Sequence, residues 1–351
     1  DLRGRYAEAL RGGEKLKDPL VVRPTSETIM YAMYAKWVHS WRDLPVLINQ
    51  WNNVVRWEKR TYLFLRTTEF LWQEGHTAQE TEKEAMDMVM AALEWYRQIY
   101  EDYFSMPVYV GRKSETEKFA GAKTTYCIEA LMPDGKALQG ATSHNLGQNF
   151  SKVFEIQFQN REGKMDHVWQ TSWGLSTRSL GGLFLTHGDD NGVIFPPKIA
   201  PVQIVIVPIK KSGSDDRELS AYCQDMREAL ANAGIRTRVD NREEPSVGRR
   251  FNEWEVKGVP IRFEVGEREL GERTVTISRR DTGEKVTVTR EQMLAQTERL
   301  LGDMQKALYQ RAKKFLDENT REAATYEEFK NIMSTTRGFI RAFWCEEAGC
   351  E

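Results

Sequence analysis

The sequence of 351 residues has only 4 cysteines, no apolar run of bilayer length and almost no excess of either charge. Four scattered cysteines are too few for a disulfide framework, so we expect reduced thiols. Without about 18 consecutive apolar residues or a charged-then-apolar leader, neither a membrane span nor a secretion signal is indicated. A net charge of −2 argues against a protein that coats nucleic acid by charge, although it permits a local basic face. The sequence predicts a cytoplasmic protein.

The length indicates more than one domain, because a single hydrophobic core rarely organises a chain of 351 residues. The hydrophobic content of 40%, with 15 Phe, 12 Tyr and 10 Trp, supplies enough apolar surface for burial. No internal repeat or low-complexity tract is visible in the sequence. We therefore expect a globular protein of several domains.

The most informative stretch covers residues 54–58 and 64–76, where arginines, carboxylates, aromatics and a histidine surround one short loop. Period-2 alternation predicts a strand that sends Arg56 and Glu58 to the same face, with Arg66 on the returning strand. A planar guanidinium makes bidentate bonds to phosphate or carboxylate, and Glu58 would accept from an amine. An exposed, salt-bridged strand would show the same alternation. The stretch thus favours a site for a charged ligand.

This pattern resembles motif 2 of class II aminoacyl-tRNA synthetases, and further segments extend the likeness. Residues 172–178, Ser-Trp-Gly-Leu-Ser-Thr-Arg, resemble motif 3, and residues 23–28, Arg-Pro-Thr-Ser-Glu-Thr, resemble the loop that receives the amino acid. With residues 72–76 and 139–144, the chain resembles the prolyl-tRNA synthetases of the archaeal and eukaryotic type. The resemblance runs from about Glu14 to the last residue, so it covers nearly the whole chain.

The resemblance implies an ATP-dependent enzyme that converts L-proline to prolyl-adenylate and transfers the prolyl group to tRNA(Pro). Such a reaction is catalysed by positioning and by cations placed where charge develops, which suits a site rich in arginine. Arg56 and Arg178 are then the catalytic residues, and Mg²⁺ is implied as the partner of the triphosphate. The ATP site would comprise Arg56, Glu58, Arg66, Thr67, Gln139, Thr142, Ser176 and Arg178.

A pocket for proline needs an apolar wall and an acceptor for the secondary ammonium. By resemblance, Thr25 and Glu27 take the ammonium, Arg56 takes the carboxylate, and the remaining lining residues are Trp72, Glu74, His76 and His144. The other three histidines, His39, His167 and His187, are expected to be structural. Ser176 stands where relatives commonly have threonine, and it keeps a hydroxyl.

We expect an α+β fold in which residues 1–198 form the class II catalytic domain, an antiparallel sheet with flanking helices. Apolar residues recur at helical spacing from Ala85 to Tyr103, which predicts one core-packing helix. Motif 1 is not recognisable near the N-terminus, so that region is expected to be missing or incomplete. About 100 residues separate motifs 2 and 3, too few for the inserted hydrolytic editing domain of bacterial-type prolyl enzymes.

Residues 199–302 are expected to form an α/β domain that resembles the anticodon-binding module of prolyl, threonyl, glycyl and histidyl enzymes. Strands are predicted at 202–207, 235–239, 261–265, 274–278 and 285–288, with a helix that ends at Gly234. Residues 289–292 fit a capping box at the start of a long helix to about Leu316. By resemblance, the residues that contact the anticodon are Arg262, Glu264, Arg279 and Arg280.

Residues 303–351 are expected to form a truncated C-terminal module. Cys345 and Cys350 supply half of a tetrahedral zinc site, because structural zinc takes four ligands from closely spaced pairs. By resemblance, the family carries two more cysteines further on. A structural Zn²⁺ is therefore a candidate cofactor.

Two alternatives stay open at the level of sequence. A threonyl enzyme would need a Cys/His zinc set in the amino-acid pocket, whereas Cys127 is the only cysteine in the first domain. A non-catalytic paralogue would bind tRNA or another protein, but all expected arginines and glutamates of motifs 2 and 3 are present. The resemblance also implies a homodimer and no membrane partner.

Overall fold

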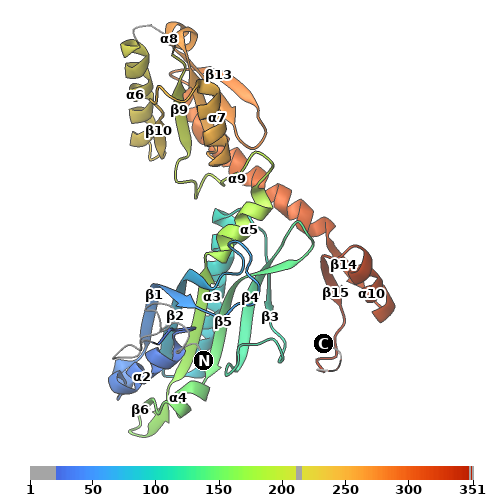
Figure 1. Cartoon of the computed structure of the whole chain (residues 1–351). Coiled ribbons are helices and arrows are strands. Elements are labelled where there is room, and N and C mark those ends of the chain that lie inside the picture. Colours follow the sequence, from blue (N-terminus) through green and yellow to red (C-terminus); the bar gives the residue numbers. More distant parts are fainter. Residues whose placement is uncertain (1–20, 211–215, 348, 350–351) are drawn as a thin grey trace, which may run out of the picture.

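The structure is a computed structural model, and it describes residues 21–210, 216–347 and 349. Figure 1 shows the domain that the sequence predicts to be catalytic (the catalytic domain) at the bottom, a second α/β domain at the top, and a small C-terminal module to the side. The N-terminal region in which motif 1 was expected to be missing, and Cys350, lie outside the described residues. The order of the domains agrees with the sequence-based prediction.

A six-stranded antiparallel sheet forms the catalytic domain, with strand order β1-β2-β8-β5-β4-β3. Its strands are β1 (Val46–Val55), β2 (Glu69–Gln79), β3 (Tyr109–Arg112), β4 (Thr124–Leu131), β5 (Ala137–Gly147) and β8 (Trp169–Ser176). A short hairpin, β6 (Gln157–Gln159) with β7 (Met165–His167), lies beside it. The predicted antiparallel sheet is confirmed.

Helices cover this sheet: α2 (Glu27–Trp37), η1 (Trp41–Asp43), α3 (Glu82–Gln98), η2 (Ile99–Tyr103), α4 (Asn149–Val153) and α5 (Arg178–His187). A Thr81–Glu84 capping box starts α3, and its apolar stripe packs on the sheet. The predicted core helix is therefore correct, although its last turn, η2, is a π-helix. The residues between β2 and β8 form α3, η2, β3–β7 and α4, and no hydrolytic domain is inserted among them.

Strand register explains why the polar residues of distant motifs meet. In β2 and β8, Trp72 pairs with Ser176, Glu74 with Gly174, and His76 with Ser172. In β5, Thr142 and His144 pair with Gly174 and Ser172. Directly opposite residues of an antiparallel pair point to the same face, so these side chains share one face of the sheet.

The second domain contains a five-stranded sheet of order β10-β9-β11-β12-β13. Its elements are β9 (Ile204–Pro208), α6 (Arg217–Asn232), β10 (Thr237–Val239), α7 (Val247–Val256), β11 (Ile261–Val265), α8 (Glu267–Glu272), β12 (Thr274–Arg279) and β13 (Lys285–Thr289). All five predicted strands are present, with ends within about two residues. Thr289 and Gln292 exchange the two hydrogen bonds of a capping box, at 3.3 and 3.4 Å, although the helix itself begins at Met293.

The long helix α9 (Met293–Glu318) passes from the second domain along the catalytic domain to the C-terminal module (Figure 1). It therefore crosses the predicted boundary at residue 302. Its first half packs in the second domain's core through Met293, Leu300 and Met304. Among the described helices, none is long and apolar enough to cross a membrane.

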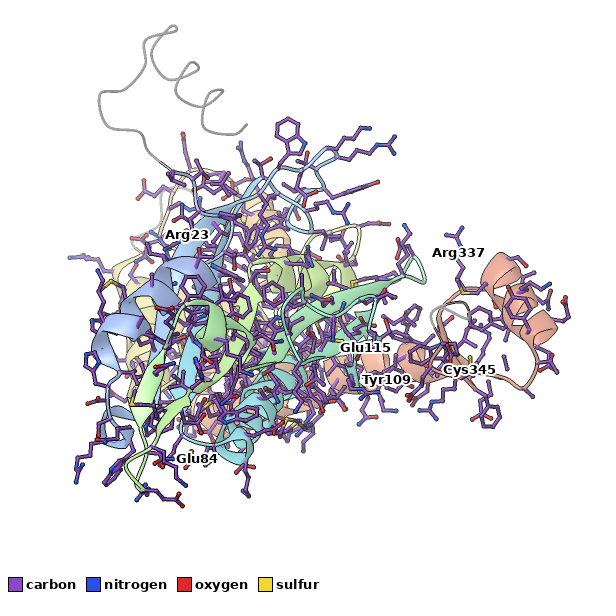
Figure 2. All side chains as sticks on the ribbon, turned by 90° about the horizontal axis from the view of Figure 1, so that it is seen from below. Arg23, Glu84, Tyr109, Glu115, Arg337 and Cys345 are labelled. Atoms are coloured by element: carbon purple, nitrogen blue, oxygen red, sulfur yellow. The ribbon has the colours of Figure 1, made fainter. Side chains whose placement is uncertain are left out.

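The C-terminal module consists of β14 (Thr320–Ala323), α10 (Tyr326–Thr335) and β15 (Phe339–Ala342). Tyr109 of β3 connects it to the catalytic domain, since its hydroxyl donates to Thr320 Oγ1 at 3.1 Å and its ring lies 5.1 Å from that of Phe339. Figure 2 shows Tyr109 on the flank of the catalytic domain that faces Cys345. The module is thus packed against β3.

Candidate active site

A cavity of about 430 Å³ lies on the polar face of the catalytic sheet. Its walls come from the start of α2, the end of β1, and strands β2, β4, β5 and β8. Gly174 lies at the centre of this face, where a Cβ atom would come within 3.2 Å of the Trp72 ring. The glycine therefore leaves room for the indole and for a ligand above it.

Thr25, Glu27 and Ser172 form an acceptor site at one end of the cavity. Glu27 receives hydrogen bonds from the Thr25 hydroxyl and from Ser172 Oγ, the latter at 2.9 Å. Glu27 is buried at the first position of α2, where the helix dipole favours a carboxylate. A buried carboxylate with free lone pairs is suited to an ammonium group.

Glu74 lies at the floor of the cavity, and its carboxylate already has several donors. Oε1 accepts from Gln50 Nε2 at 2.6 Å, from Asn52 Nδ2 at 2.8 Å and from the Ser26 hydroxyl, while Oε2 lies 2.8 Å from His76 Nε2. Burial alone would raise the pKa of Glu74, but the hydrogen bonds of His76, Ser26 and Asn52 lower it. Glu74 is thus held as an anion that orients its neighbours.

Arg56 follows β1 and is positioned by three groups. Its Nε donates to Pro24 O at 2.9 Å, and the guanidinium carbon lies 5.2 and 5.5 Å from the ring centres of Phe70 and Trp72. These contacts use one of the guanidinium N–H donors and add two cation–π contacts. Arg56 lines the cavity between Thr25, the neighbour of Pro24, and Arg178, whose pKa its charge helps to lower.

His144 and Phe119 line the apolar end of the cavity. Their ring centres lie 4.9 Å apart, and His144 Nδ1 is 2.9 Å from Thr125 Oγ1. Burial, with smaller contributions from Lys113 and His76, lowers the pKa of His144 to about 4. The imidazole is therefore neutral at pH 7 and adds no positive charge beside Glu27.

Gln139, Thr142, Ser176 and Arg178 line the opposite end. Arg178 opens α5, where its backbone N–H bonds Ser176 Oγ at 3.3 Å and its Nε bonds Leu65 O at 2.8 Å. Burial, together with the nearby Arg66 and Arg56, lowers the pKa of Arg178. The guanidinium nevertheless stays charged, and a cation at a helix N-terminus makes this end a site for anionic groups.

Several predicted residues lie outside the cavity lining. His76 is fully buried behind Glu74. Glu58, Arg66 and Thr67 belong to the loop between β1 and β2, where Glu58 and Arg66 pair at 3.9 Å. The prediction that Arg66 lies on the returning strand is wrong, because the chain turns between Tyr62 and Arg66 and β2 begins only at Glu69. Arg56 and Glu58 likewise follow the end of β1 at Val55.

The residues that line the cavity but were not among the predicted site residues include Lys113, Glu117, Phe119, Thr125 and Ser172. Ser172 had a detectable signal, because it alternates with Gly174 and Ser176 on the same strand face. Phe119 had none, since it comes from an irregular loop with no periodic pattern. Tertiary folding alone brings that ring to His144.

Comparisons with known proteins agree with this geometry. The tRNA synthetase class II core domain (G, H, P, S and T) matches residues 11–186, and the anticodon binding domain matches residues 203–299. A proline–tRNA ligase from Chlorobaculum tepidum is 53% identical over 95% of this chain and 69% of the relative. One from Natranaerobius thermophilus is 50% identical over 97% of this chain and 70% of its own length. The chain belongs to the class II prolyl-tRNA synthetases.

Solved structures support the same assignment. The prolyl-tRNA synthetase of Cryptosporidium parvum, complexed with halofuginone and AMPPNP, has a TM-score of 0.93 and 44% identity over 97% of this chain and 69% of its own. The same enzyme complexed with L-proline and AMP has a TM-score of 0.92 and 44% identity over 96% of this chain and 70% of its own. The predicted family, its fold and its proline–tRNA ligase activity are confirmed.

The four predicted anticodon residues are ion-paired in the structure. Arg262 bonds Glu264 at 2.9 Å and stacks 4.1 Å from the centre of the Phe251 ring, and Arg279 bonds Asp281 at 2.8 Å. Lys285 also bonds Glu264, at 2.8 Å. Arg280 instead bonds Asp189 of the catalytic domain. Arg262 and Glu264 do share a strand face, as predicted.

Proposed function

We propose specific roles for these residues in the reaction of the family, proline activation with ATP and prolyl transfer to tRNA(Pro). The main support is that one sheet face holds a carboxylate acceptor at one end, an arginine-bearing helix start at the other, and Arg56 between them. Proline's ammonium binds Thr25 and Glu27, and its ring lies among Trp72, Phe119 and His144. Glu74 and His76 are positioning residues, because their hydrogen bonds hold the floor of the cavity in place.

At the other end of the cavity, the ATP phosphates bind Arg178 and Arg66, and the adenine amine donates to Glu58. Thr67, Gln139, Thr142 and Ser176 supply further hydrogen bonds. Arg56 then holds the proline carboxylate and the α-phosphate together. A carboxylate oxygen bonds to the α-phosphorus, the bond to the β-phosphate oxygen breaks, and pyrophosphate leaves. A ribose hydroxyl of tRNA later attacks the carbonyl carbon, and AMP leaves.

Mg²⁺ would enter with ATP. Among the described residues, no three His, Cys, Asp or Glu side chains gather to hold a metal ion. Mg²⁺ suits this arrangement, since it usually retains waters and binds substrate phosphates with few protein ligands. When bound, it neutralises part of the triphosphate charge, and the arginines hold the remaining phosphate oxygens.

Replacing Glu27 with glutamine tests the proline end. The change removes the charge that complements the ammonium but keeps the size, so KM for proline should rise at least tenfold, or about 1.4 kcal/mol. KM for ATP should stay within about twofold, because the phosphate end is untouched. The measurement is pyrophosphate exchange at varied proline and ATP, with an amino-acid panel as specificity control. A rise in KM for ATP without one for proline would mean that the two ends are exchanged.

We also propose a homodimer formed through the back of the β1–β2 edge. This surface exposes Leu47, Trp51 and Leu71, with 57, 80 and 62% of each residue accessible. Strand alternation places Leu47 and Trp51 on the face opposite to Gln50 and Asn52, which donate hydrogen bonds to Glu74 on the cavity side. Exposed apolar residues that gather on one strand pair mark an interaction surface.

Replacing Trp51 with glutamate should convert a dimer to a monomer at micromolar concentration, because an aromatic anchor is lost and a charge would be buried. Size-exclusion chromatography with light scattering gives the mass. Val153→Glu is the matched control, since Val153 is also exposed, at 77%, but lies on α4. An unchanged dimer in the Trp51 variant would show that this surface is not the interface.

We propose domains at 1–198, 199–302 and 303–351, a cytoplasmic location, and anticodon contact through Arg262, Glu264 and Arg279. Cys345 is exposed and would supply one zinc ligand. The described residues do not form a zinc site by themselves, so Cys350 and further ligands would have to complete it.

A further inference from the structure

The second domain contacts the catalytic domain where the chain leaves α5. Arg280, which follows β12, donates from Nη1 and Nη2 to the two carboxylate oxygens of Asp189, at 2.8 and 2.5 Å. Its Nη2 also donates to Gly192 O at 3.2 Å, and its Nε to Glu255 O at 3.1 Å. One guanidinium therefore joins the turn after α5 to the end of α7.

The backbones pack directly on each other at this joint. Gly192 has φ +125°, and a Cβ there would lie 2.6 Å from Val256 Cα. A Cβ on Gly258 would lie 2.7 Å from Val193 O, and Phe195 N donates to Gly258 O at 3.2 Å. The two backbone segments, residues 192–195 and 256–258, thus approach too closely for side chains to fit between them. This close contact fixes the distance between the segments.

A second, separate attachment runs through Gln305 of α9. Its Nε2 donates to Asp102 O, Tyr103 O and Ser105 Oγ, at 3.1, 3.2 and 2.8 Å. Its Oε1 accepts from Lys198 N at 3.1 Å. A domain attached at one place is free to turn about it, whereas two attachments fix its orientation.

Arg280 is poorly placed to read a base. Its side chain is only 5% exposed, and all its nitrogens are engaged within the joint. Base edges are read by donors that face an open groove. Arg280 does border a hollow of about 140 Å³ whose other walls include Arg262, Arg279 and Lys285. It therefore borders the same hollow as the residues proposed to contact the anticodon, while its own donors are used within the joint.

We propose that Asp189 and Arg280 form an interdomain latch that positions the anticodon-binding domain for tRNA, and that Arg280 is a positioning residue and not an anticodon reader. This inference rests on the proposed function. One tRNA has to occupy the cavity of the catalytic domain and the hollow of the second domain together. Fixed orientation raises the effective concentration of the second contact once the first has formed. Amino-acid activation needs only the first domain and does not depend on the latch.

The test compares Asp189→Asn, Arg280→Gln and the double variant. Each single change should lower kcat/KM for full-length tRNA roughly tenfold, the scale of a lost hydrogen-bonded charge pair. The double variant should lose no more than either single one, because both changes remove the same contact. Pyrophosphate exchange without tRNA, and charging of a minihelix that carries only the acceptor stem, should stay within about twofold.

Arg290→Gln is the matched control, because its pair with Asp225, at 2.8 Å, lies wholly within the second domain. Loss of tRNA charging in Arg280→Gln but not in Asp189→Asn would overturn the latch and make Arg280 a direct tRNA contact. An equal loss of pyrophosphate exchange would also overturn it, since the joint would then act on the active site itself. If the wild-type chain itself showed no proline-dependent pyrophosphate exchange, the proposed function would be contradicted. That result differs from both outcomes that would overturn the latch. Asp189→Asn keeps the test usable if Arg280→Gln does not fold.

Discussion

Replacing Arg178 with alanine is expected to lower the rate of proline-dependent pyrophosphate exchange by a factor of about 10² to 10³, the loss seen when one preorganised donor is removed. Arg178 lies at the start of α5, and its Nε donates to the Leu65 carbonyl. This bond holds the guanidinium at the end of the cavity proposed to bind ATP. Negative charge moves onto the leaving pyrophosphate during the reaction, so the effect should appear mainly in kcat.

The fold should tolerate this change. Gly182 of the same helix packs against the sheet so closely that a Cβ would lie 2.6 Å from Leu138, and that contact does not involve Arg178. Arg161→Ala is a suitable control, since Arg161 is an exposed arginine paired with Glu80 far from the cavity lining. Near-normal exchange by the Arg178 variant, with an unchanged melting temperature, would contradict the assignment of residues 172–178 to the phosphate site.

The polar face of the sheet could be predicted because it depends on alternation between neighbouring residues within each strand. Alternation in residues 72–76 places Trp72, Glu74 and His76 on one face, and alternation in residues 172–176 does the same for Ser172 and Ser176. The pairing register of the two strands decides which of these residues lie opposite each other, and it cannot be derived from the sequence alone. The resemblance to a known family placed both segments in one site but did not give their register.

Other features were hidden because they arise from contacts between distant segments. Glu74 lines the cavity, but the donors that engage its carboxylate, Ser26, Gln50 and Asn52, come from other segments of the chain. The residues of the β1–β2 loop keep no strand periodicity, so Arg66 was placed on a strand in error. The partner of Arg280, Asp189, is 91 residues away in the chain, and charge patterning cannot reveal such a pair.

Replacing Arg56 with lysine is expected to lower exchange activity at least a hundredfold, although the positive charge is retained. The guanidinium is planar and has five N–H donors in a fixed fork, of which Nε is used by Pro24 O. The outer nitrogens make no hydrogen bond to the described residues, so they could bond the proline carboxylate and the α-phosphate at once. A lysine ammonium is a single point of charge with freely rotating donors, so it would bond one group or the other.

The kinetic pattern separates this role from that of Glu27. Because Arg56 would touch both reactants, its loss should raise KM for proline and for ATP and also lower kcat, whereas Glu27→Gln should affect proline alone. Arg56→Ala, which also loses the cation–π contacts with Phe70 and Trp72, should be no more active than Arg56→Lys. If Arg56→Lys raised only one of the two KM values and left kcat intact, Arg56 would belong to a single subsite. The reacting atoms would then have to be brought together by other residues of the cavity, with Arg178 as the first candidate.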